Sequence, residues 1–133
     1  MLHAEITEKI LEACFEVIND LGAGFLESVY EKALVVALRQ KGLKVESQVE
    51  LEVKFRGVIV GNFCADIIVE DKVVVEVKAV KSLLPEHMAQ VINYLKAARI
   101  DIGLLVNFGR QRLEYKRLYK ESDTEAKPAE GVK

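Results

Sequence analysis

Three residues whose side chains suit metal and acid–base chemistry stand near one another in the middle of the sequence. Asp66 lies within one apolar segment, and Glu76-Val77-Lys78 lies within the next. Side chains alternate between the two faces of a strand, so Glu76 and Lys78 are expected to share a face. A hairpin turn at Asp71-Lys72 would pair the two segments and bring Asp66 beside Glu76.

Two carboxylates at that separation raise each other's pKa unless a cation lies between them. A hard divalent ion relieves this repulsion, and Mg²⁺ suits such oxygen ligands best, with Mn²⁺ as the alternative. An ion held there would polarise a phosphoryl oxygen and lower the pKa of a water molecule. Lys78 would orient or deprotonate that water. We therefore expect Asp66, Glu76 and Lys78 to support metal-dependent cleavage of phosphodiesters.

A strand in which Val alternates with Glu and Lys is ordinary, and Glu-x-Lys alone would be structural in about nine cases of ten. A second motif adds weight. Glu27 and Tyr30 stand three residues apart on the first turns of an expected helix, so their side chains lie near each other. We expect Glu27 to reach inward, the alternative being that it complements the positive helix N-terminus. For Tyr30 we favour a place in the core, and we keep it as a candidate substrate-binding residue.

A third motif lies on another expected helix. Gln90 and Tyr94 are one turn apart and are offset from the apolar stripe of that helix. They are candidate substrate-binding residues. By spacing alone, an amide and a phenol at the margin of the core explain the pair equally well. We interpret His87, which precedes them, as a surface or capping residue and not as a metal ligand.

The apolar periodicity predicts the elements that position these residues. Residues 5–21 and the stretch after Gly24 have the spacing of amphipathic helices, and a third helix begins at Pro85. The segments rich in β-branched residues predict strands, with Arg56-Gly57 and Asp71-Lys72 as turns between the first three. The expected strands are Val45–Phe55, Val58–Val69, Val73–Val80, Ile102–Phe108 and Leu113–Tyr119. The order of elements indicates an α+β domain.

Length and composition are consistent with one intracellular domain. The 133 residues suit a single hydrophobic core, which we place in residues 1–120, and residues 121–133 have the composition of a disordered tail. No apolar run approaches the roughly 20 residues that span a bilayer, and the N-terminus lacks the apolar block of a signal peptide, so we expect a cytoplasmic protein. Cys14 and Cys64 lie in apolar surroundings and are interpreted as buried reduced thiols.

The net charge of −2 argues against a strongly basic, sequence-indifferent nucleic-acid binder. One stretch near the C-terminus is nevertheless locally basic, because only Glu114 opposes its cations. We interpret it first as an edge strand protected from aggregation by positive charge, although it also permits contact with nucleic acid. Its cations are Arg110, Arg112, Lys116, Arg117 and Lys120.

Taken in chain order, these residues resemble the motifs of the GxxExxY proteins of the PD-(D/E)XK nuclease superfamily: Gly24-x-x-Glu27-x-x-Tyr30, Asp66, Glu76-Val77-Lys78 and Gln90-x-x-x-Tyr94. The resemblance covers residues from about 5 to 119. It implies a restriction-endonuclease-like αβββαβ core, in which helices flank a central mixed sheet, with one extra helix at the N-terminus. Ala65 stands where the superfamily's name has Pro.

The resemblance also implies roles for individual residues. Asp66, Glu76 and the backbone carbonyl of Val77 would be metal ligands, and Glu27 would support the metal. Lys78 would lie near the attacking water. Gln90 and Tyr94 match a helix motif that helps set the site and the path of the nucleic acid.

The leading expectation is a magnesium-dependent nuclease that acts on DNA, as a homodimer because cutting two strands usually takes two sites. The alternative is a catalytically silent module that keeps the nuclease fold and binds nucleic acid or protein, an interpretation favoured by the near-neutral charge. A purely structural oligomerisation domain ranks last, since it leaves the clustered charges unexplained. The likeness to nucleases does not by itself fix the function.

Overall fold

The structure is a computed structural model, and it describes residues 2–120. Three helices and five strands follow one another in the order expected from the sequence. The helices are α1 (Ala4–Leu21), α2 (Glu27–Gln40) and α3 (Pro85–Ala98), and the strands are β1 (Val45–Phe55), β2 (Val58–Val69), β3 (Val73–Lys78), β4 (Ile102–Asn107) and β5 (Glu114–Tyr119). The expected disordered tail at 121–133 lies outside the described residues.

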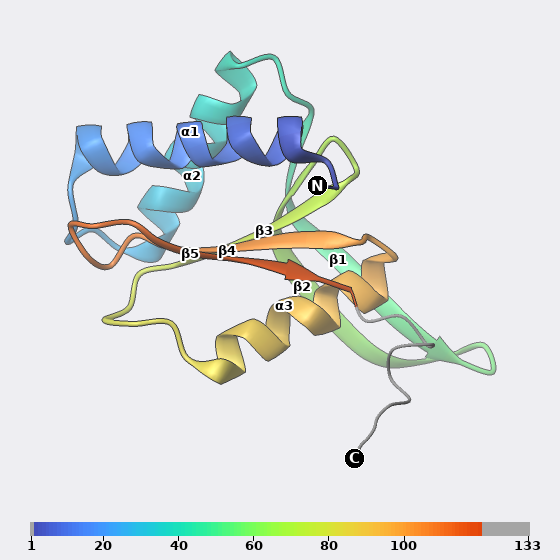
Figure 1. Cartoon of the computed structure of the whole chain (residues 1–133). Helices are drawn as coiled ribbons and strands as arrows, with labels where there is room; N and C mark the ends of the chain where they lie inside the picture. The colour runs from blue at the N-terminus through green and yellow to red at the C-terminus, as the bar shows by residue number, and fades with distance from the viewer. Residues whose placement is uncertain (1, 121–133) are drawn as a thin grey trace.

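The five strands form one mixed sheet in the order β1-β2-β3-β4-β5. All neighbours are antiparallel except β3 and β4, which are parallel and are connected through α3. Helices α1 and α2 cover one face of the sheet and α3 covers the other (Figure 1). The predicted α+β architecture, with a mixed sheet between helices, is therefore confirmed. Strand β5 is at the edge of the sheet, as expected for the basic stretch.

Alternation along β3 divides its side chains between two cores. Val73, Val75 and Val77 pack with α1 and α2, whereas Val74 packs with α3. Glu76 therefore belongs to the α3 face, as its spacing predicts. Val, which is β-branched, suits both faces of such a buried central strand.

The turn between β2 and β3 lies one residue earlier than the sequence suggested. Glu70 and Asp71 are its two positive-φ residues, at 55° and 56°, and the Lys72 amide donates to the Val69 carbonyl at 2.9 Å. The prediction of Asp71-Lys72 as the turn was thus wrong by one position. The pairing of Val69 with Val73 nevertheless keeps Asp66 opposite Glu76.

The long β1–β2 hairpin changes faces part-way along. On β1, Val45 packs in the core under α1 and α2, but Val49 and Leu51 pack against α3, although all three have the same parity. On β2, Ile67 and Ala65 are divided in the same way. The outer half of the hairpin consequently leaves the α1–α2 layer and extends past α3 (Figure 1).

The change of face along β1 has a cause in its backbone. Gln48 has a φ of 52°, a left-handed conformation that breaks the alternation of side chains. The neighbouring pairs Ser47–Ile67 and Val49–Ala65 place Gln48 level with Asp66. Both strands are therefore distorted at the level of the candidate acidic residue.

Candidate active site

Asp66 and Glu76 lie at the point where the β2–β3 ladder ends. Regular pairing stops at Ile67–Val75, one residue before them. Side chains take over the next hydrogen bonds: Glu76 Oε1 accepts from the Asp66 amide at 3.2 Å, and Asp66 Oδ2 accepts from the Val77 amide at 2.9 Å. The expected convergence of these two carboxylates is thus present, and each acid is tied to the backbone of the opposite strand.

Burial makes this acidic pair unusual. Glu76 is only 4% exposed, and desolvation together with the negative charge of Asp66 raises the pKa of its carboxyl group to about 8. Desolvation also raises the pKa of Asp66, although the hydrogen bond from Val77 opposes that shift. A buried and a half-buried acid that both have raised pKa values are a common feature of functional sites.

Lys78 is the last residue of β3 and lies on the same face as Glu76. It is half-buried, and no carboxylate of the described residues lies within 4.0 Å of its ammonium group. Its positive charge still acts on both acids, since it lowers the pKa of Asp66 and of Glu76 against the larger effect of burial. The structure therefore brings the three expected residues into one neighbourhood.

Helix α2 brings further negative charge to the site. Glu27 is half-buried, and its charge adds to the raised pKa of Glu76. One helical turn later, Glu31 is also half-buried; burial raises its pKa first, and the charges of Asp66 and Glu27 raise it further. Glu27 was predicted from the sequence as a site residue, whereas Glu31 was not. Their spacing of four residues, which places two like charges on one helix face, was the available signal.

Gln48 connects this helix to the strands. Its Nε2 donates to Glu31 Oε2 at 2.6 Å, and its Oε1 accepts from the Cys64 thiol at 3.2 Å. A hydrogen bond from Gln48 also favours the charged form of Asp66. No residue pattern indicates this role, because the position of Gln48 depends on its left-handed backbone.

Tyr94 and Gln90 reach the same site from α3. Tyr94 is 6% exposed, and burial raises its pKa before the charges of Glu76 and Asp66 raise it further. A hydrogen bond from the Gln90 side chain favours the ionised phenol. Tyr94 therefore lies close enough to be influenced by both carboxylates, and Gln90 lies beside Tyr94.

Tyr30 does not belong to this group. It is fully buried, its ring stacks on Phe108 at 5.0 Å between centroids, and its hydroxyl group donates to the Gly22 carbonyl. The same hydroxyl accepts from the Phe25 amide at 3.1 Å. The core position favoured from the sequence agrees with the structure, and the candidate role in direct substrate binding does not fit so complete a burial.

The two cysteines differ. Cys14 is buried in the core under α1 and α2, as expected, but Cys64 is exposed. The prediction for Cys64 was wrong because the hairpin has left the α1–α2 layer at this point, and Cys64 pairs with exposed Glu50 instead of with a core residue. His87 acts as a cap, as expected: its Nδ1 accepts from the Leu84 amide at 3.0 Å at the start of α3.

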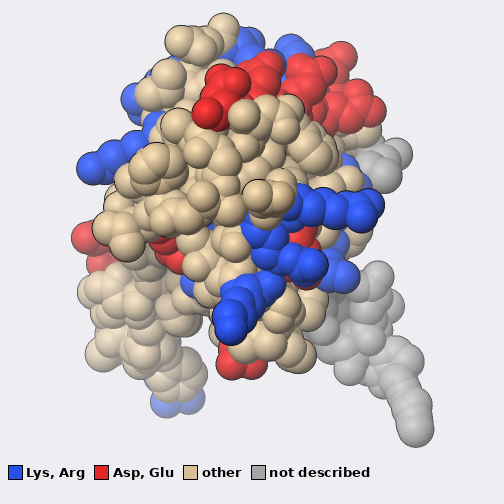
Figure 2. Space-filling view, turned by 90° about the vertical axis from the view of Figure 1, so that its left-hand side faces the viewer, with Lys and Arg blue, Asp and Glu red and all other residues tan. Residues whose placement is uncertain are grey.

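The buried side-chain amide of Asn107 fixes two loops, the one that follows Lys78 and the one that follows Asn107 itself. Asn107, on β4, pairs with Lys78 on β3. The Asn107 side chain accepts hydrogen bonds from the Val80 and Gly109 amides and donates one to the Val80 carbonyl, each at 2.9 Å. These loops lie at the left end of the molecule in Figure 1, and basic side chains gather on that end (Figure 2). The exposed cations on the loops are Lys81, Arg110 and Arg112.

Comparison with known families agrees with this geometry. Residues 4–118 match the family model of the PD-(D/E)XK nuclease superfamily. The chain belongs to this superfamily. The acidic pair and Lys78 on neighbouring strands of this PD-(D/E)XK protein are the residues that the sequence motifs single out. No curated protein matches the chain.

Two solved structures resemble this PD-(D/E)XK domain in fold. The crystal structure of SSO0001 has 21% sequence identity and a TM-score of 0.57, and the match covers 92% of this chain and 59% of the other. An alkaline exonuclease from Laribacter hongkongensis has 11% identity and a TM-score of 0.54, with 91% and 72% covered. The domain thus spans little more than half the length of SSO0001. At these identities the likeness shows the fold alone.

The donor set of this PD-(D/E)XK domain suits a hard divalent cation. Asp66, Glu76 and the Val77 carbonyl would supply only oxygen ligands, and burial raises the pKa of both acids, so a bound cation would favour their charged forms. Within residues 2–120, no group of three His, Cys, Asp or Glu side chains is clustered as a ready-made metal site.

Helices of the described part lack the length and apolar composition needed to cross a membrane.

Proposed function

We propose that this chain is a metal-dependent nuclease that hydrolyses phosphodiester bonds in DNA. One observation carries the proposal: two carboxylates with raised pKa values, the buried Glu76 and the half-buried Asp66, lie on adjacent strands, and Lys78 lies on the same face of β3 as Glu76. A protein interior keeps such an acidic pair at a cost in stability, which a catalytic role explains.

Asp66, Glu76 and the Val77 carbonyl would hold the cation, with Mg²⁺ as the preferred ion and Mn²⁺ as a substitute. When bound, the ion would supply charge stabilisation at a phosphoryl oxygen and a lowered pKa for water. Glu27 and Glu31 add negative charge from α2 and favour cation binding at a distance. The hydrogen bond from Val77 orients the Asp66 carboxylate toward the shared site.

Lys78 would orient the attacking water and take part in its deprotonation. Its position at the end of β3 is fixed from both sides, since the Phe108 amide donates to the Lys78 carbonyl at 2.8 Å and Asn107 holds the loop that follows. A flexible side chain on a fixed backbone suits this role. Tyr94 and Gln90 would bind the substrate beside the two acids.

We also propose DNA as the substrate, cleavage of duplex DNA by a homodimer, and a cytoplasmic location. One chain offers one site, and two copies would supply one site for each strand. The basic loops that carry Lys81, Arg110 and Arg112 support contact with phosphates near the end of β3.

The second candidate is a module that binds nucleic acid or protein without cleavage. The net charge of −2 favours it, because strong phosphate binding normally requires a clear excess of Lys and Arg. In this case the acidic pair would be a remnant of the fold, and its replacement would leave binding unchanged.

A cleavage assay separates the two candidates. Labelled single-stranded, duplex and branched DNA, and the matching RNA, are incubated with Mg²⁺ or Mn²⁺ and with EDTA. We expect metal-dependent products from the natural protein, none from Asp66→Asn, and normal products from Asp71→Asn, which alters an exposed carboxylate at the turn of the same hairpin. Products that persist at equal rates in Asp66→Asn, or no products from the natural protein under every condition, would reject the nuclease.

A further inference from the structure

A pocket of about 630 Å³ lies between the outer half of the β1–β2 hairpin and the C-terminal part of α3. We call it the hairpin pocket; its main lining residues are Lys54, Val60 and Phe63 on the hairpin and Asn93, Lys96 and Arg99 on or just after the helix. Its volume falls in the range of pockets that bind ligands of a few hundred daltons. The acidic pair does not line it.

A β-bulge shapes the hairpin side of this pocket. The pairing shifts between Val53, which pairs with Gly61, and Lys54, which pairs with Ile59, so Val60 is the extra residue. The shift in pairing falls at the pocket itself, because Val53, Lys54, Val60 and Gly61 all line it.

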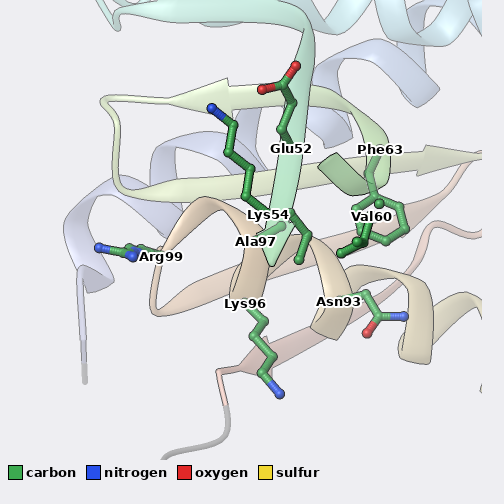
Figure 3. A pocket seen from close by; sticks show the side chains of 10 residues that line it. Glu52, Lys54, Val60, Phe63, Asn93, Lys96, Ala97 and Arg99 are labelled. Carbon is green, nitrogen blue, oxygen red and sulfur yellow. The ribbon is translucent and has the colours of Figure 1, made fainter. Parts of the chain in front are cut away.

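The hairpin pocket combines an apolar floor with a basic rim. Figure 3 shows Val60 and Phe63 side by side on the hairpin, while the basic groups of Lys54, Lys96 and Arg99 extend outward in different directions. Glu52 is the one acidic side chain among the lining residues, so the lining carries three positive charges against one negative. Cations around an aromatic surface are the arrangement that binds single-stranded nucleic acid.

An aromatic pair joins this pocket to the candidate active site. The Phe63 ring lies 5.7 Å from the Tyr94 ring, centroid to centroid. After burial, the charges of Glu76 and Asp66 contribute to the raised pKa of Tyr94, so Tyr94 lies near both acids. Along β2, the lining residues from Phe63 to Val60 are about 10–20 Å from Asp66 at roughly 3.3 Å per residue. A strand bound at the acids would therefore reach the pocket within a few nucleotides.

From this continuity we infer that the hairpin pocket binds the flanking segment of a single nucleic-acid strand, a few nucleotides from the bond that is cut. The inference deepens the proposed function and rests on it for the position of the cut. The three cations contact backbone phosphates, and the half-buried ring of Phe63 contacts a base. A duplex is too wide for a pocket of this volume, so the segment enters unpaired.

Binding is tested with the full chain in the Glu76→Gln background, without metal, so that cleavage cannot shorten the probes. Fluorescence anisotropy gives the affinity for labelled single-stranded DNA of increasing length. We expect affinity to rise once a probe exceeds the footprint of the acidic site by a few nucleotides. The double variant Lys54→Glu/Lys96→Glu is expected to remove that rise, with about a tenfold loss for long probes and little change for short ones.

Two controls make the test specific. Lys9→Glu makes the same kind of charge change at an exposed position on α1. We expect this substitution to change the affinity for long probes by less than about twofold. Glu52→Gln, which removes the acidic member of the lining, should tighten the binding of long probes. Equal losses in Lys9→Glu and in a pocket variant would show a nonspecific charge effect and overturn the inference.

Different results reject the proposed subsite and the proposed nuclease activity. If long and short probes bind the protein with an unaltered hairpin pocket equally well, or if the pocket variants retain the length dependence, the subsite is rejected whatever the cleavage assay shows. If the length dependence is present but no substrate is cut, the subsite stands and the proposed function is rejected. In an active protein, the pocket variants should raise KM and leave kcat unchanged.

Discussion

Glu76 Oε1 accepts a hydrogen bond from the backbone amide of Asp66 at 3.2 Å, at the point where the two strands stop pairing through their main chains. An acid side chain here replaces a ladder hydrogen bond. Burial raises the pKa of Glu76 most, and the same arrangement brings a second carboxylate close enough to raise it further. The architecture of the sheet and the electrostatics of the site thus have one origin.

The raised pKa of Glu76 predicts how stability depends on pH. The folded protein keeps this proton up to about pH 8, whereas the unfolded chain releases it near 4.5. Between these values the folded state binds more protons, so the free energy of unfolding should fall as pH rises, by on the order of a few kcal/mol. Below that window the full stability is present.

Urea unfolding of the metal-free protein across pH 4.5 to 8 measures this effect. Glu76→Gln should flatten most of the dependence and should be more stable than the natural protein at pH 8. Glu86→Gln, which alters an exposed glutamate in the first turn of α3, serves as the control. Its free energy of unfolding should depend on pH as that of the natural protein does. A Glu76→Gln protein with an unchanged slope would show that Glu76 titrates normally.

Lys78 should matter for turnover and not for cation binding. Lys78→Ala removes the group that orients the water, and general acid–base contributions of this kind are worth about 10²–10⁴-fold in rate. Single-turnover cleavage with saturating Mg²⁺ gives the rate, and a Mn²⁺ titration gives the affinity. Lys72→Ala, an exposed lysine at the turn before β3, should behave as the natural protein does. A normal rate in Lys78→Ala would remove Lys78 from the chemistry.

The left-handed backbone of Gln48 predicts a difference between two substitutions. Gln48→Ala and Gln48→Gly both lose the hydrogen bonds to Glu31 and Cys64, but only Gly relieves the strain of a φ of 52°, which is about 1 kcal/mol. We expect the Gly variant to be the more stable by about that amount in urea unfolding. Both variants should weaken Mn²⁺ binding to a similar extent. Equal stability of the two variants would argue against the strained conformation.

Gly109 should be intolerant of any side chain. A Cβ there would lie 2.2 Å from the Val80 carbonyl oxygen and 2.4 Å from the Val80 nitrogen, which are backbone atoms that Asn107 holds in place. Gly109→Ala should therefore destabilise the fold by about 2–4 kcal/mol. Gly61→Ala is the control, since its nearest contact is 3.4 Å and the expected cost is below about 1 kcal/mol. Thermal unfolding that ranks the two variants equally would contradict the packing of these loops.

Much of this structure could be predicted from the sequence, because its patterns are local. The β-branched segments and the alternation along β3 gave the strands and the face that Glu76 occupies. The motif spacing gave Asp66, Lys78, Tyr94 and Glu27. Helical spacing also placed Tyr30 in the core.

The remaining features depend on backbone conformation that side-chain patterns do not encode. Nothing in residue type marks Gln48 as left-handed, so neither its link to Glu31 nor the change of face of the hairpin was foreseen. The exposure of Cys64 follows from that change of face. The bulge at Val60, which shapes the hairpin pocket, is likewise invisible in a sequence of alternating apolar residues.

The central claim is that Asp66 and Glu76 together bind a divalent cation, and direct titration of the purified protein with Mn²⁺ tests it most closely. Isothermal calorimetry at pH 8 should show saturable binding of one ion per chain, weakened by at least about tenfold in Asp66→Asn and in Glu76→Gln and unchanged in Asp71→Asn and Glu86→Gln. The same affinity in all five proteins, or no binding by the natural one, would contradict the account.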